Sequence, residues 1–223
     1  MAKNMIKTRI RTGDQVQVIG GRGTGRRALQ EGEDTALLGK RGKVLAGRII
    51  LFNGVGSSGK STAARALQSI ARRPLLHVQM DAFLEMAPPA PDAFLFQTRK
   101  HPEGPEVEIV STALGDQLMT AMRHAVAAMA QSGADLILDD VMTEDDKAAS
   151  LSHYTGLPLS KVGFFAPLDV LEARERARGD RMIGLARWQI DRVHEGMTYD
   201  LTVDSAAATP EGIARQICDA LDL

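Results

Sequence analysis

Residues 48–62 read Arg48-Ile49-Ile50-Leu51-Phe52-Asn53-Gly54-Val55-Gly56-Ser57-Ser58-Gly59-Lys60-Ser61-Thr62, and this stretch decides the fold. The short apolar run at its start predicts a buried strand. An Ala/Leu-rich segment follows its glycine-rich loop and predicts a helix. The pattern G-x-x-x-x-G-K-S between a strand and a helix predicts a phosphate-binding P-loop.

Each fixed position of this motif has a physical role. Gly54 and Gly59 allow backbone angles that a Cβ would forbid, so successive N–H groups can turn inward around phosphate oxygens. The start of the helix adds the positive end of its dipole, and the Lys60 ammonium reaches the β- and γ-phosphates. The Ser61 hydroxyl is the expected ligand of a bridging Mg²⁺. We therefore expect ATP and Mg²⁺ as cofactors, with nucleotide contacts from Gly54, Val55, Gly56, Ser57, Ser58, Gly59, Lys60, Ser61 and Thr62.

Composition places the chain among ordinary globular proteins. It has 223 residues, of which 44% are hydrophobic and 25% charged, and its formal net charge is −1. No apolar run approaches the ~20 residues that cross a bilayer. The N-terminus shows no secretory signal, and the single Cys218 excludes an internal disulfide. We therefore expect a cytoplasmic protein without a membrane partner; the sequence leaves a homo-oligomer open.

The first 47 residues differ from the rest in charge. They carry ten Lys or Arg and four Asp or Glu, which predicts a boundary near Gly47 between a basic extension and a domain of residues 48–223. Residues 11–21 and 39–45 resemble parts of the KOW motif of ribosomal and transcription proteins. Two interpretations stay open: a flexible or strand-adding extension, and a nucleic-acid contact through the basic residues.

Beyond the P-loop, apolar runs alternate with helical patterns. This alternation predicts an α/β fold of the P-loop kinase-like class, with a five-stranded parallel sheet and helices on both faces. The further strands are expected at residues 75–80, 134–140, 161–166 and 199–204. Helices are expected at residues 106–131, from an N-cap at Thr143, across residues 172–181, and from Thr209 with Pro210 at its first position.

The proline-rich stretch of residues 83–91 cannot be a long regular helix. Together with the apolar residues that follow it, this stretch could wall a pocket for an apolar ligand or pack as a loop on the domain. Composition alone leaves both interpretations open.

Charged residues after the later strands extend the predicted site. The run Leu136-Ile137-Leu138-Asp139-Asp140 has the form of a Walker B element, so Asp139 is expected to serve Mg²⁺ together with Ser61. The role of Asp140 stays open. Arginines at 174, 178 and 181 follow the fourth strand; they could belong to a mobile lid over the phosphates or to a solvated helix with Glu/Arg pairs.

Several of these pieces resemble the chloramphenicol phosphotransferases, P-loop kinases that phosphorylate a primary hydroxyl of that antibiotic. The resemblance rests on residues 49–61, 81–88, 104–106, 136–141, 177–181, 193–196 and 199–204, and spans about residues 48–221. It implies that Asp81 is the base that accepts the proton of the substrate hydroxyl, and that Arg178 and Arg181 close over the nucleotide. With Lys60, these are the expected catalytic residues.

The sequence thus predicts an ATP-dependent O-phosphotransferase that acts on a hydroxyl of a small molecule, with chloramphenicol or a similar compound as the first candidate and antibiotic inactivation as the outcome. Residues 90–101 differ in composition from the antibiotic enzymes, and acceptor specificity is expected there. Two alternatives stay open: a kinase of another metabolite or of a nucleotide-sugar, as in zeta-type toxins, and a nucleotide-dependent protein that contacts RNA through residues 1–47. The roles of Arg174 and His194 stay open too.

Overall fold

The computed structural model describes residues 45–179 and 182–223. Its strands are β1 (Ile49–Gly54), β2 (Leu76–Gln79), β3 (Phe94–His101), β4 (Gly104–Ser111), β5 (Leu136–Asp140), β6 (Leu159–Phe165) and β7 (Leu201–Asp204). Its helices are α1 (Lys60–Ile70), α2 (Met80–Leu84), α3 (Ala113–Gln131), α4 (Lys147–Ser152), α5 (Leu168–Arg178), α6 (Leu185–Arg192) and α7 (Pro210–Leu221).

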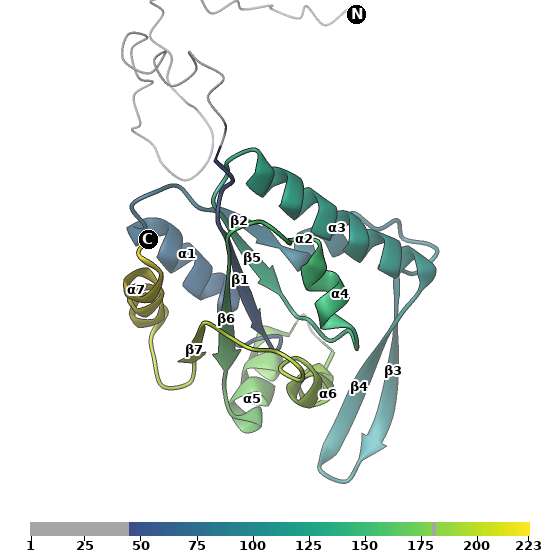
Figure 1. Ribbon diagram of the computed structural model, residues 1–223. Coiled ribbons are helices and arrows are strands. Elements are labelled where there is room, and N and C mark those ends of the chain that lie inside the picture. The colour runs from purple at the N-terminus through teal and green to yellow at the C-terminus, as the bar shows by residue number, and fades with distance from the viewer. Residues whose placement is uncertain (1–44, 180–181) are drawn as a thin grey trace, which may run out of the picture. The chain divides into compact units, whose positions relative to one another are not determined.

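Five parallel strands form the central sheet in the order β2-β5-β1-β6-β7, which confirms the predicted α/β fold (Figure 1). The connections after β1 lead first to one side of this strand and later to the other. In such sheets, ligands bind at the carboxyl ends of the strands where the order reverses. The P-loop leaves β1 at that point.

The central strand explains why the two faces are covered by helices. Ile50 and Phe52 of β1 are fully buried in a cluster with residues of α1 and α7. Ile49 and Leu51 are buried in a second cluster, which includes residues of α3. Because successive side chains of a strand point to opposite faces, an unbroken apolar run needs cover on both sides. Figure 1 shows α1 and α7 on one side of the sheet and α3 on the other.

A two-stranded antiparallel hairpin of β3 and β4 was not expected from the sequence. The predicted single helix over residues 106–131 is wrong, because residues 104–111 form β4 and the helix begins only at Ala113. Thr112 separates them as the N-cap of α3, where its side chain accepts a hydrogen bond from the Gly115 N–H. Val107 and Val110 fit a helical period, but their pairing with Thr98 and Leu95 makes them strand residues.

Other boundaries are closer to expectation. The last helix begins at Pro210 with Thr209 as its N-cap, as predicted. The cap of α4 is Asp146 rather than Thr143, because the Asp146 carboxylate accepts the Ala149 N–H at 2.9 Å. Helix α6 was not predicted.

The basic segment of residues 1–47 lies outside the described residues except at its end. Its KOW-like strands, the RNA contact and the boundary near Gly47 therefore stay predictions. No helix in residues 45–179 and 182–223 has the length and apolar character of a membrane span.

Candidate active site

The P-loop is shaped by two glycines, one at a strained backbone angle and one at a position where a side chain would clash. Gly59, which precedes α1, has φ 86°, in the left-handed region that favours glycine. A Cβ on Gly54 would lie 2.6 Å from the Phe164 carbonyl oxygen of the neighbouring strand β6. The loop therefore turns tightly out of β1 and enters α1 with its backbone exposed toward a cavity.

Four side chains meet at the start of α1. Ser61 Oγ donates to Asp139 Oδ2 over 2.6 Å, and Lys60 Nζ lies 3.9 Å from Asp139 Oδ1. His77 Nε2, from β2, lies 3.4 Å from Asp139 Oδ2. Lys60 Nζ also donates to the Gly54 and Val55 carbonyls at 2.8 and 3.0 Å, so its ammonium lies inside the loop.

These contacts set the charge of Asp139. Burial by itself would raise the pKa of this carboxyl, but the hydrogen bond from His77 and the charge of Lys60 outweigh burial. The hydrogen bond from Ser61 acts in the same direction, and the pKa of Asp139 lies below its usual value. The carboxylate is therefore ionised at neutral pH and available to a cation.

A cavity of about 550 Å³ lies against the P-loop. It joins the phosphate-binding loop, the tip of β5, helix α2 and the loop after β7. Asp81, the second residue of α2, lines the same cavity as Lys60 and Ser61. The full lining is Gly56, Ser57, Gly59, Lys60, Ser61, Thr62, Arg65, Gln79, Met80, Asp81, Asp139, Val141, Arg174, Arg178, Ser205, Ala208, Pro210 and Ile213.

The cavity fits the phosphates of a nucleotide. Ser57 lines the cavity, and its buried Oγ has no hydrogen-bond partner within the described residues. Buried polar atoms are normally paired, so this hydroxyl in a phosphate-binding loop retains the capacity to donate to an acceptor such as a phosphate oxygen. The α1 N-terminus and the Lys60 ammonium add positive potential at the same place.

The donor set also fits Mg²⁺. A serine hydroxyl and a carboxylate, Ser61 and Asp139, are 2.6 Å apart, and hard oxygen ligands are those that Mg²⁺ takes. In the part of the chain that the structure describes, no group of three or more His, Cys, Asp or Glu could hold a metal. Mg²⁺ would therefore need water and phosphate oxygens to complete its shell, as is usual for this ion.

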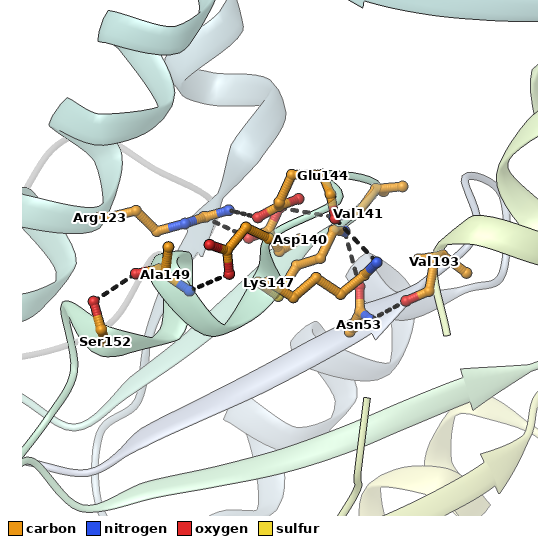
Figure 2. Close-up of polar contacts among 11 residues, drawn as sticks. Asn53, Arg123, Asp140, Val141, Glu144, Lys147, Ala149, Ser152 and Val193 are labelled. Atoms are coloured by element: carbon orange, nitrogen blue, oxygen red, sulfur yellow. Dashed lines mark hydrogen bonds and ion pairs between the residues drawn. The ribbon is translucent and has the colours of Figure 1, made fainter. Parts of the chain in front are cut away.

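Asp140 turns away from this cavity. Its carboxylate accepts Arg123 Nη1 at 2.5 Å and the Val141 N–H at 2.8 Å, and Arg123 Nη2 donates to Glu144 Oε1 at 3.1 Å (Figure 2). Burial raises the pKa of Asp140 and Arg123 opposes this shift. The second aspartate of the Walker B element thus fixes the peptide beside Asp139.

Two of the three arginines considered for a lid, Arg174 and Arg178, lie on α5. Arg174 and Arg178 line the cavity, and Arg174 Nη2 donates to the Ser205 carbonyl after β7 at 2.7 Å. Arg174 therefore ties α5 to the loop that closes one side of the cavity. Arg181 lies outside the described residues, and its role stays a prediction.

A partly buried hydrogen-bond chain supports the base of the P-loop. Asn53 Nδ2 donates to the Tyr199 hydroxyl at 2.8 Å, and this hydroxyl lies 2.7 Å from His194 Nδ1. The direction of the hydrogen bond between this hydroxyl and His194 Nδ1 follows the tautomer of the imidazole: the hydroxyl donates to an unprotonated Nδ1 or accepts from a protonated one. Burial and the charges of Lys60 and Lys147 lower the pKa of His194 to about 4, although a hydrogen bond to Phe164 opposes them. The imidazole is neutral at physiological pH.

The neutral state of His194 predicts how the stability of the fold depends on pH. The unfolded state binds a proton at His194 below pH 6.5 and the folded state only below about pH 4, so stability falls as the pH falls between these values. Urea unfolding measures the free energy of unfolding at neutral pH and again near pH 4. Between these two pH values, we expect the parent to lose more of this free energy than a His194→Gln variant. Equal losses in the two proteins would contradict the assignment.

Sequence reasoning missed the residues that support the site from a distance. His77, Arg123 and Gln189 contact the P-loop or the tip of β5 through hydrogen bonds that span 17 to 133 residues. None of them belongs to a local motif. Only Arg123, which is the one Lys or Arg of α3, gave a signal in the sequence.

The fold and the cavity define the class of protein. A P-loop opens from the centre of a five-stranded parallel sheet, and two carboxylates, an ammonium and three arginines line the cavity beside it. This is the arrangement of a P-loop kinase-like phosphotransferase.

The comparisons with known proteins agree. The family described as chloramphenicol phosphotransferase-like protein matches residues 47–222. The chain belongs to this family, and it is a phosphotransferase enzyme. A protein named "Putative O-phosphotransferase" in two strains of Mycobacterium tuberculosis is 28% identical over 181 residues, which are 77% of this chain and 80% of that protein.

Solved structures show the same fold. The APS kinase of Mycobacterium tuberculosis, solved with AMPPNP and APS, is similar at TM-score 0.57 and 15% identity, over 80% of this chain and 99% of that one. A gluconokinase from Sinorhizobium meliloti is similar at TM-score 0.51 and 18% identity, over 80% and 93% of the two chains.

Proposed function

We propose that the protein is a cytoplasmic, ATP-dependent O-phosphotransferase that moves the γ-phosphate of ATP to a hydroxyl of a small molecule. Chloramphenicol or a similar compound is the first candidate acceptor, with inactivation of the antibiotic as the result. The observation that carries the proposal is that Lys60, Ser61 and Asp81 all line the same cavity. A phosphate-binding loop and a carboxylate on one cavity are what transfer to an alcohol needs.

Each residue of the cavity has a separate role in the proposed transfer. The P-loop amides and Lys60 hold the β- and γ-phosphates and stabilise the negative charge on the transferred group. Ser61 and Asp139 would hold Mg²⁺, which supplies further charge neutralisation when bound. Asp81 accepts the proton of the attacking hydroxyl, and Arg178, on the lid side of the cavity, pairs with phosphate oxygens as the site closes.

The test is a panel of acceptors with Mg²⁺ and ATP. We expect mass spectrometry to show chloramphenicol, or another small alcohol of the panel, gaining one phosphoryl group. A Lys60→Met variant, which keeps the side-chain length but not the charge, should leave every acceptor unmodified. If the parent phosphorylates none of a broad set of antibiotics, sugar acids and nucleosides, the proposed function is wrong.

A further inference from the structure

Helix α6 packs against the P-loop through apolar residues, with Ala186 in one buried cluster with Val55, and it hydrogen-bonds to the loop backbone through Gln189. Gln189 Oε1 accepts the Gly56 N–H over 2.8 Å, and Gln189 is 4% exposed. Gly56 lines the cavity of the proposed active site. The orientation of one peptide of the phosphate-binding loop therefore depends on a side chain that lies 133 residues later in the chain.

Both ends of α6 are fixed as well. At its start, the buried Glu175 carboxylate of α5 accepts the Gly184 and Ala186 N–H groups at 2.8 and 3.0 Å. Past its end, the Val193 carbonyl accepts Asn53 Nδ2 at 2.8 Å, and Asn53 directly precedes the P-loop glycine (Figure 2). Since Glu175 and Asn53 are both buried, these bonds do not compete with water.

The same helix also contacts the β3–β4 hairpin. Arg187 donates to the Glu103 carboxylate at 2.8 Å and to the Glu172 carboxylate of α5 at 2.6 Å. The Val107 N–H of β4 donates to the Gly184 carbonyl at 3.0 Å. Helix α6 thus has the hairpin at its beginning and the P-loop at its middle and end.

We propose that Gln189 is a positioning residue for phosphoryl transfer, which couples α6 and the hairpin to the conformation of the P-loop. It touches no reacting atom. It acts by holding the Gly56 peptide, so that the loop stays in one conformation as long as α6 keeps its contacts with α5 and the hairpin. This rests on the proposed function as far as turnover is concerned, whereas the coupling between α6 and the loop can be measured with nucleotide alone and needs no acceptor.

The test compares the parent with Gln189→Met, which keeps side-chain length but lacks the acceptor oxygen. Asp191→Asn, an exposed change on the same helix, is the matched control. Hydrogen exchange is measured with and without Mg²⁺ and ADP. We expect ADP to slow exchange in residues 54–62 of all three proteins, and in residues 185–192 of the parent and the control only.

Turnover provides the second readout. Gln189 holds only the Gly56 peptide, and Lys60 and the other loop amides still hold the phosphates in Gln189→Met. The loss should therefore fall on the orientation of the transferred group, and kcat should fall by ~10- to 100-fold with chloramphenicol or whichever panel compound the parent phosphorylates. The Kd for ADP should stay within about twofold of the parent value.

Three results would overturn the proposal. These are ADP-induced protection of α6 that persists in Gln189→Met, protection of α6 that is absent from the parent, and a loss of ADP affinity as large as the loss of kcat. If the parent phosphorylates no acceptor, the proposed function fails, while the exchange measurement still decides whether Gln189 couples α6 to the loop.

Discussion

Replacing Asp81 with asparagine is expected to lower kcat by ~10²–10⁴ while ATP binding is retained. Asparagine keeps the shape of the side chain but cannot accept a proton from the attacking hydroxyl. The position lines the same cavity as Lys60 and Ser61, yet the phosphates are to be held by the P-loop, so affinity for ATP should change little. Steady-state kinetics and calorimetric titration with ATP measure the two effects separately.

The matched control is Glu85→Gln. Glu85 directly follows α2 and is exposed. The substitution therefore removes a carboxylate close to Asp81 in the sequence, at a residue that does not line the cavity. The control should turn over at the parent rate. A parent-like rate in Asp81→Asn would instead show that another group, or none, takes the proton.

Replacing Arg123 with methionine is expected to destabilise the fold by about 3–5 kcal/mol. Arg123 and Asp140 are 4% and 1% exposed, and their charges compensate each other in the interior. Without the guanidinium, Asp140 is a buried carboxylate that has lost its cationic partner, and methionine restores volume but no charge. Urea unfolding of parent and variant gives the difference in the free energy of unfolding.

Two further measurements separate this effect from a general packing defect. In Arg123→Met the pKa of folded Asp140 should rise further above its unfolded value, so the destabilisation should be larger at pH 8 than at pH 5. Arg99→Met breaks the pair of the exposed Arg99 with the partly buried Glu108 on the hairpin and should cost less than about 1 kcal/mol. A loss in Arg123→Met that is no larger than in Arg99→Met would contradict the account.

The sequence predicted those parts of the molecule whose signal is local. The strand, loop and helix around Gly54 and Lys60 follow from apolar runs and glycine chemistry, and the same holds for the parallel sheet. The Walker B carboxylate Asp139 could be placed because it ends an apolar run, and the structure brings it to 2.6 Å from Ser61 Oγ.

The β3–β4 hairpin could not be predicted, for a physical reason. Residues 104–111 are strand because residues 94–101 pair with them, and nothing in either segment alone excludes a helix or a loop. Gln189 and Arg123 were missed because the importance of each comes from one distant partner, Gly56 or Asp140. Spacing along the chain carries no information about such contacts.

A crystal structure with Mg²⁺ and a non-hydrolysable ATP analogue decides whether the cavity beside the P-loop is a site of phosphoryl transfer. We expect the polyphosphate within the loop of residues 54–61, the metal against Ser61, and the Asp81 carboxylate facing the terminal phosphate across the same cavity. A nucleotide bound elsewhere, or an Asp81 side chain directed away from the terminal phosphate, would contradict this expectation.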